Sequence, residues 1–190
     1  MSARDDLVLL DLDGTLTDSA PGILTSVRHA YGALRLPVPA EPVLRGFVGH
    51  AVYPGIPECL TALRGAGLRL AVATSKPEPM AWRIVEHFGL DAHLDRGLDD
   101  VFGATLDGTR STKADVVAHA LASLDAARRV VMVGDREHDV LGAAAHRVPC
   151  VGVAWGYARP GELAAAGATA VVGTPAGLAT VLLRRAPLAA

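Results

Sequence analysis

Asp11-Leu12-Asp13-Gly14-Thr15 directly follows the apolar run Leu7-Val8-Leu9-Leu10, and the fold is decided at this junction. A short apolar run that is closed by a glycine turn is typical of a buried strand, here over residues 7–12. Two acids at positions i and i+2 of an extended chain point to the same side. The sequence therefore places two carboxylates at the carboxyl end of a strand, the edge at which open α/β sheets bind ligands.

The proximity of Asp11 and Asp13 needs a chemical explanation. Two carboxylates held close together repel each other unless a cation, a shared proton or a catalytic task compensates. A metal-dependent site for phosphoryl transfer is the first hypothesis. On these residues alone, an ordinary Asp-x-Asp-Gly turn is the alternative.

Strand and helix patterns alternate along most of the chain. The further expected strands are short apolar runs at 68–74, 101–103, 129–133, 150–154 and 170–172. The expected helices cover 57–65, 79–88, 111–124, 137–145, 161–166 and 176–184. Strands without polar alternation, joined by helices, indicate a parallel sheet that is covered on both faces. The predicted fold class is therefore α/β, with a Rossmann-like core around a central parallel sheet.

Residues 16–52 interrupt this alternation. Two amphipathic helices are expected at 23–34 and 41–48, with Pro37, Pro39 and Pro42 between and beside them. We interpret the segment as a helical insertion above the end of the first strand. Residues 1–15 and 53–190 would then form the core.

Composition limits the classes of partner and the location of the protein. A chain of 190 residues with a net charge of −2 and no long charged run fits one domain that binds neither nucleic acid nor a membrane surface. It has no apolar run of the ~20 residues that a membrane span needs. Its polar, acidic N-terminus is no signal peptide. Cys59 and Cys150 are isolated, so we expect free buried thiols and a cytoplasmic protein.

A bias toward arginine makes the lysines informative. Of the 18 basic residues, only Lys76 and Lys113 are lysines. The two side chains are not interchangeable where a compact point charge is required. Both positions are therefore candidates for a functional lysine. A solvated surface side chain is the alternative for Lys76.

Further chemical side chains follow the later strands: Thr74-Ser75, then Lys113, then Asp135 with Asp139. This order resembles the four motifs of the haloacid dehalogenase (HAD) superfamily of phosphatases, particularly phosphoglycolate phosphatases and 5′-nucleotidase-like enzymes. The matching stretches are Leu10-Asp11-Leu12-Asp13-Gly14-Thr15-Leu16, Ala73-Thr74-Ser75-Lys76-Pro77, Thr112-Lys113-Ala114 and Gly134-Asp135-Arg136-Glu137-His138-Asp139.

The resemblance implies a role for each residue in a reaction through an aspartyl-phosphate. Asp11 would be the nucleophile, and Asp13 would protonate the leaving oxygen and then activate water. Thr74, Ser75, Lys113 and Gly14 would bind the phosphate, with Thr74 and Lys113 counted among the catalytic residues. Mg²⁺ would be held by Asp11, the Asp13 main-chain carbonyl, Asp135 and Asp139. Acids that only stabilise a helix N-terminus are the alternative for Asp135 and Asp139.

The insertion is shorter than the helical cap that such phosphatases carry. Several dozen residues are missing between Gly49 and Tyr53, so the resemblance implies a reduced cap and an open site. We expect a phosphatase acting on a small phosphorylated metabolite, either phosphoglycolate-like or nucleotide-like. A phosphomutase of the same superfamily and a non-catalytic scaffold that lost its cap are the alternatives. Apolar surface on the cap remnant would permit a homodimer.

Overall fold

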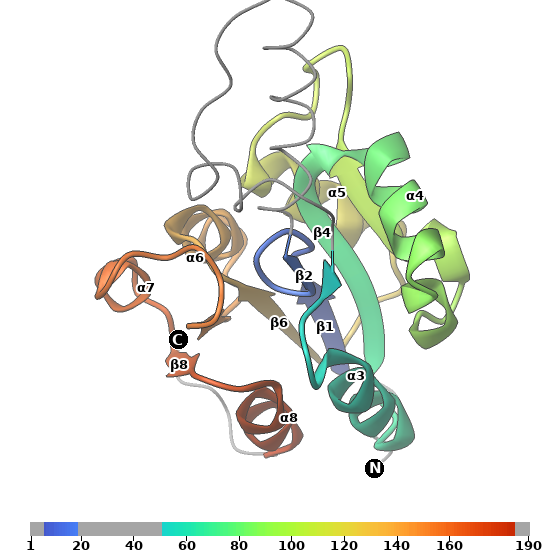
Figure 1. Cartoon of the computed structure of the whole chain (residues 1–190). Helices are drawn as coiled ribbons and strands as arrows, with labels where there is room; N and C mark the ends of the chain where they lie inside the picture. The colour runs from blue at the N-terminus through green and yellow to red at the C-terminus, as the bar shows by residue number, and fades with distance from the viewer. Residues whose placement is uncertain (1–5, 19–50, 185–190) are drawn as a thin grey trace, which may run out of the picture.

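The computed structural model describes residues 6–18 and 51–184, which form an α/β core. Its six-stranded sheet has the order β5-β4-β1-β6-β7-β8, and all neighbouring strands are parallel. β1 lies in the middle, between β4 and β6 (Figure 1). The predicted fold class is confirmed. The strands are β1 (Asp6–Leu10), β4 (Arg69–Pro77), β5 (Val101–Ala104), β6 (Arg129–Gly134), β7 (Cys150–Val153) and β8 (Ala170–Val172).

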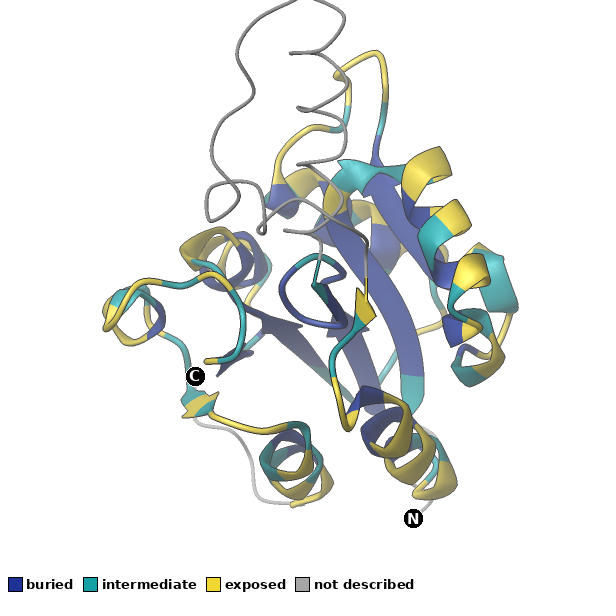
Figure 2. Ribbon diagram, in the orientation of Figure 1, coloured by how far each residue is buried: buried dark blue, intermediate teal, exposed yellow. Residues whose placement is uncertain are grey.

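Helices cover both faces of the sheet. Val8 and Leu10 of β1 pack in one apolar cluster, and Leu7 and Leu9 pack in the other. Because successive strand residues point to opposite faces, a strand covered on both sides is apolar throughout. Figure 2 shows most of the sheet buried and the exposed residues on the outer sides of the helices. One face carries α3 (Ile56–Gly65), α4 (Glu78–His87) and α8 (Pro175–Leu183), and the other carries α5 (Lys113–Ser123), α6 (Glu137–Ala144) and α7 (Glu162–Ala165).

A small antiparallel pair stands where the interrupting segment leaves the core and returns to it. β2 (Thr17–Asp18) pairs with β3 (Ala51–Val52). The Tyr53 N–H then donates to the Leu16 carbonyl at 3.1 Å. The helices expected at 23–34 and 41–48, and the dimer surface expected on them, lie outside the described residues.

The region around β4 and β5 differs from the sequence prediction. β4 continues past Thr74 to Pro77, and its register with β5 shifts between Ala73 and Pro77. Two unpredicted 3₁₀ helices, η2 (Leu90–His93) and η3 (Gly97–Asp100), precede β5. The buried Asp100 carboxylate accepts hydrogen bonds from the main-chain N–H and the guanidinium of Arg96, which stabilise this turn.

Two predictions from composition can be compared with the described residues. Cys59 and Cys150 are free and buried, as predicted. Within the described ranges, no helix combines the length and the apolar character that crossing a membrane requires.

Candidate active site

The site is centred on a buried lysine at the carboxyl edge of the sheet. Lys113 is the first residue of α5, and its Nζ lies 2.5 Å from Asp11 Oδ1 and 2.7 Å from Asp139 Oδ1. The same Nζ donates to the Ala73 carbonyl at 2.9 Å. Asp11 follows β1, Ala73 lies in β4 and Asp139 lies in α6. One ammonium group therefore joins three segments that are far apart in the sequence.

Local structure fixes the positions of Lys113 and Asp139. The Thr112 side chain caps α5 by accepting from the Asp115 N–H at 3.2 Å, and the Asp115 carboxylate accepts from the Thr112 N–H at 3.0 Å. In α6, Asp139 Oδ2 accepts from the Arg136 N–H at 3.0 Å while Oδ1 faces Lys113. Asp139 thus both supports the helix start, as the structural alternative predicted, and takes part in the charged cluster.

Three buried carboxylates meet in this cluster. One oxygen from each of Asp11, Asp135 and Asp139 lies within 4.8 Å of the other two. Burial raises the pKa of Asp11, and the Lys113 ammonium offsets this rise only in part. The nearby Asp139 and Asp135 carboxylates raise the same pKa further. Burial likewise raises the pKa of Asp135 to about 6. Burial alone would lower the pKa of Lys113, but its ion pairs with Asp11 and Asp139 raise it, so this group stays charged.

The surroundings of Asp135 fit a divalent cation. Its Oδ2 accepts from the Tyr157 N–H at 2.7 Å, whereas its buried Oδ1 has no hydrogen-bond partner among the described residues. Gly14, at φ +87°, and Gly156 approach so closely that a Cβ on either would collide with the Asp135 side chain. A hard cation such as Mg²⁺ prefers carboxylate oxygens, and it would compensate the excess negative charge that one lysine leaves.

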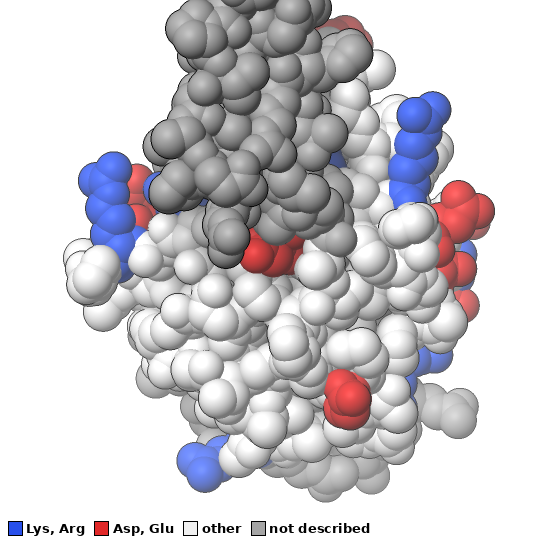
Figure 3. All heavy atoms as spheres, viewed as in Figure 1, with Lys and Arg blue, Asp and Glu red and all other residues white. Residues whose placement is uncertain are grey.

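Asp13 lies apart from the buried cluster and binds the second lysine. Its Oδ2 is 3.0 Å from Lys76 Nζ, and both side chains are partly exposed. Thr74 is buried, and its Oγ1 accepts from the Lys76 N–H at 3.2 Å. Ser75 is exposed and lines an open cavity of about 510 Å³ together with Lys113. In the space-filling view, acidic side chains appear near the centre of the face and most of the surrounding surface is uncharged (Figure 3).

All the sequence-predicted site residues lie at this edge of the sheet, at or just after the ends of β1, β4 and β6 or at the starts of α5 and α6. Asp11, Lys113, Asp135 and Asp139 form the buried cluster. Asp13 and Thr74 are each linked to Lys76 instead.

Sequence reasoning left Lys76 without a role and did not identify Tyr157. Lys76 is not simply a solvated side chain, since it forms an ion pair with Asp13. The scarcity of lysine was the signal that could have found it. Tyr157 contacts Asp135 through its main-chain N–H, which every residue except proline carries, so no sequence signal identifies it. Its hydroxyl donates to Asp18 Oδ1 at 2.7 Å, which connects the same loop to β2.

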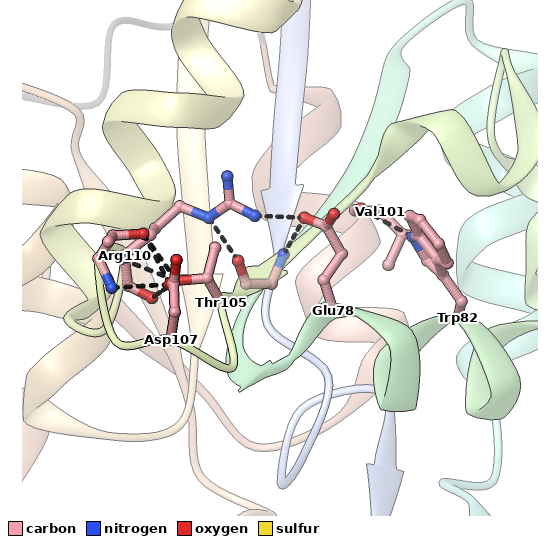
Figure 4. A network of polar contacts seen from close by, with 8 residues as sticks. Glu78, Trp82, Val101, Thr105, Asp107 and Arg110 are labelled. Atoms are coloured by element: carbon pink, nitrogen blue, oxygen red, sulfur yellow. Dashed lines mark hydrogen bonds and ion pairs between the residues drawn. The ribbon is translucent and has the colours of Figure 1, made fainter.

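A second unpredicted feature is a polar network between Glu78 of α4, β5 and the loop that precedes α5 (Figure 4). Arg110 donates to Glu78 Oε2 and to the Gly103 carbonyl, each at 2.7 Å. The Gly103 N–H also donates to Glu78 Oε2, at 3.0 Å. The network joins the start of α4, strand β5 and the loop that leads to Lys113. It therefore supports the two segments that carry the lysines.

Comparison with known proteins gives consistent results. The family described as haloacid dehalogenase-like hydrolase matches residues 41–147. The tyrosine-protein kinase PtkA of Mycobacterium tuberculosis is 44% identical over 188 residues, covering 80% of this chain and 63% of PtkA, so the chain spans less than two thirds of that relative.

Two further proteins match at greater coverage of their own length. A 5′-nucleotidase of Pseudomonas aeruginosa is 36% identical over 195 residues, covering 83% of this chain and 86% of the nucleotidase. The crystal structure of a predicted phosphatase from Clostridium acetobutylicum superimposes with a TM-score of 0.80 at 34% identity, covering 94% of this chain and 98% of the other.

Proposed function

Because this chain belongs to the haloacid dehalogenase-like hydrolases, we propose that it is a Mg²⁺-dependent phosphatase that hydrolyses a small phosphate monoester through phosphorylated Asp11. The observation that carries the proposal is the contact of Lys113 Nζ with both Asp11 and Asp139, beside a buried Asp135. A structural ion pair needs one acid for one base. A surplus of buried carboxylates instead suits a site that receives a cation and a phosphate.

The reaction would proceed in two displacements. An Asp11 oxygen attacks phosphorus, the bond to the ester oxygen breaks, and Asp13 gives its proton to the leaving oxygen. Asp13 then takes a proton from water, whose oxygen attacks phosphorus and releases Asp11 and inorganic phosphate. Splitting the reaction through a covalent intermediate lowers each barrier.

The other residues would hold the phosphate and balance charge. Lys113 attracts the phosphoryl oxygens and keeps Asp11 oriented through Oδ1. The Thr74 hydroxyl and the Ser75 N–H are the proposed donors to the phosphate. Asp11, Asp135, Asp139 and the Asp13 carbonyl are the proposed ligands of Mg²⁺, which supplies charge stabilisation to the transferring group when bound.

The substrate is expected to be small and the site accessible, with little selection by the size of the substrate. The alignment with the 5′-nucleotidase has 195 positions but includes only 83% of this 190-residue chain. Several dozen positions of the alignment are therefore gaps in this chain. This supports a reduced cap. Since caps exclude water and contribute substrate contacts, we propose an accessible site that accepts phosphoglycolate-like or nucleotide-like esters.

Protein tyrosine phosphorylation is a second candidate, favoured by the 44% identity with a protein named tyrosine-protein kinase. The two candidates differ in the acceptor of the phosphoryl group. Radiolabelled ATP incubated with the protein would label tyrosine if the kinase is correct. If the phosphatase is correct, tyrosine should stay unlabelled, and phosphate should be released from phosphate monoesters instead.

The deciding experiment measures phosphate release from p-nitrophenyl phosphate and a panel of small phosphate esters, with Mg²⁺ or with EDTA. Asp11→Asn should abolish release while circular dichroism shows an unchanged fold. Asp125→Asn, which alters an exposed acid, is the matched control and should retain activity. Full activity in Asp11→Asn, or no Mg²⁺-dependent release by folded wild-type protein, would contradict the proposal and favour the scaffold alternative. Transfer to a sugar hydroxyl instead of water would identify a phosphomutase.

A further inference from the structure

The side chain of Lys76 is directed to Asp13 by an irregularity in β4. The register between β4 and β5 shifts between Ala73 and Pro77, and the Lys76 N–H turns back to the Thr74 hydroxyl. Lys76 Nζ then lies 3.0 Å from Asp13 Oδ2. This irregularity at residues 74–76 of β4 thus accompanies the placement of an ammonium group at the site.

The acid that follows Lys76 in the sequence is occupied elsewhere. Glu78 accepts from Arg110, as Figure 4 shows, and it also accepts from the Gly103 N–H. Gly103 permits this close approach, because a Cβ there would come within 2.6 Å of the Glu78 main chain. The network holds the residues after Lys76 in place and leaves the ammonium directed at Asp13.

The two lysine–aspartate pairs differ in access to solvent. The side chains of Lys113 and Asp11 are 4% and 8% exposed, whereas those of Lys76 and Asp13 are 20% and 24% exposed. A substrate group can therefore reach Lys76 without displacing the core. Solvent screens a partly exposed ion pair more than a buried one, so the Lys76–Asp13 pair contributes less to stability than the Lys113–Asp11 pair.

The position of Lys76 relative to the leaving group follows from the proposed function, on which this inference rests. If Asp13 protonates the leaving oxygen, its carboxylate lies about 2.6–3.2 Å from that oxygen. Because Lys76 Nζ is 3.0 Å from Asp13 Oδ2, the ammonium lies within about 6 Å of the leaving oxygen when Oδ2 is the atom that protonates it. An anionic group one or two bonds beyond the ester linkage would reach ion-pair distance.

We propose that Lys76 is a specificity-determining residue that binds an anionic group on the leaving group, so that the enzyme prefers phosphate esters with a second negative charge beside the ester bond. Lysine suits this role because its flexible stem carries a compact charge that can move from Asp13 to the substrate. Lys113 serves the transferred phosphate, and Lys76 serves the group that departs.

Two esters of similar size that differ in this charge provide the test. Phosphoglycolate carries a carboxylate where 2-hydroxyethyl phosphate carries a neutral alcohol. Wild-type protein, Lys76→Met, Lys76→Arg and the control Arg83→Met, which removes an exposed charge on α4, are compared by kcat/KM for both esters. We expect Lys76→Met to lower the ratio of the two kcat/KM values by roughly 10- to 100-fold, the range for a hydrogen bond to a charged group, mainly through the KM for phosphoglycolate. Lys76→Arg should recover much of the ratio, and Arg83→Met should leave it unchanged.

An unchanged ratio in Lys76→Met would overturn the inference, because a lysine that only orients Asp13 affects both esters equally. Calorimetric titration of the same esters in the presence of Mg²⁺ separates this failure from failure of the proposed function. If wild-type protein hydrolyses neither these two esters nor any ester of the panel described above, the phosphatase proposal fails. In that case the anion site is still supported if wild-type protein binds phosphoglycolate more tightly than 2-hydroxyethyl phosphate and Lys76→Met removes this difference. Equal binding of both esters by wild-type protein would overturn the inference.

Discussion

At the scale of single residues, Lys113 has the largest effect on the site. Its Nζ contacts Asp11, Asp139 and the Ala73 carbonyl from one point in a buried position. A buried charge is costly unless it is paired and hydrogen-bonded, and here both conditions are met. The geometry depends on a compact ammonium, which explains lysine at this position in a chain whose other bases, apart from Lys76, are arginines.

Lys113→Arg is therefore expected to be damaging although it conserves charge. The planar guanidinium cannot direct its donors to all three acceptors from one atom. We expect kcat to fall by about 10²-fold or more, as for loss of a donor at a charged transition state. The measurement is hydrolysis of p-nitrophenyl phosphate, with the exposed Arg128→Lys as the control. Activity within threefold of wild type would refute the geometric argument.

The raised pKa of Asp135 gives Mg²⁺ binding a defined pH dependence. Metal binding needs the ionised carboxylate, so protons compete with Mg²⁺ once the pH falls below the pKa of about 6. Asp11, whose pKa is raised to about 7, must ionise as well, so affinity should be nearly constant only above about pH 8 and should decrease by roughly tenfold per pH unit for each proton displaced at lower pH. Calorimetric titration of Mg²⁺ from pH 5 to 8 measures this change, and Asp135→Asn should remove binding. Affinity that is independent of pH would exclude Asp135 as a ligand.

At the scale of elements, the site depends on how closely α5 and α6 approach each other. Gly142 of α6 packs against the Lys113 side chain, where an added Cβ would lie 2.7 Å from Cγ and 2.8 Å from Cβ. The absence of a side chain at position 142 lets α6 bring Asp139 to Lys113. Helix packing and catalytic geometry are therefore coupled at this glycine.

Gly142→Ala should consequently reduce activity even though alanine favours helix formation. The new methyl group would displace Lys113, and small misplacements of reacting groups cost up to about 10²-fold in rate. We expect kcat to decrease by about tenfold or more without a gain in stability. Gly65→Ala in α3 is the matched control, since a Cβ there meets no atom within 4 Å. It should leave activity unchanged and stabilise by up to about 1 kcal/mol. Equal behaviour of the two variants would contradict the packing argument.

At the scale of the whole molecule, the sheet separates two apolar layers, and each contains one cysteine. Cys59 belongs to the cluster around α3, α4 and α8, and Cys150 belongs to the cluster around α5, α6 and α7. Burial raises the pKa of Cys59 to about 11, and burial also raises the pKa of Cys150. The two thiols therefore report on both layers of the core.

Both thiols should be unreactive in the native protein at pH 8 and should react together when it unfolds. The thiolate is the reactive species, and burial suppresses it. Labelling with a thiol reagent across a urea gradient should coincide with the loss of circular dichroism, as expected for one cooperative unit. Below pH 8 the thiols stay protonated in both states. Above pH 9 only the unfolded state ionises, so stability should fall. Labelling of one cysteine well before the other would show that the two layers open separately.

The local elements could be predicted because their causes are local. The apolar run Leu7–Leu10 defines a strand buried on both sides, and the residues after it define a turn rich in carboxylates. Helix starts such as that of α5 carry their caps in the sequence. The alternation of these elements determined a parallel α/β sheet, since consecutive parallel strands need crossovers.

The tertiary structure alone decided which charged groups meet. Lys113 is 102 residues from Asp11 in the chain, and only the strand order β4-β1-β6 brings α5 and α6 to the end of β1. The Lys76–Asp13 pair depends on a register shift in β4 that no residue pattern signals, and Tyr157 binds Asp135 through a main-chain N–H. The sequence by itself thus determined the fold class and the chemical residues. Their pairing came from the packing of distant segments, because the charge and burial of each group depend on neighbours that the chain brings together only when it folds.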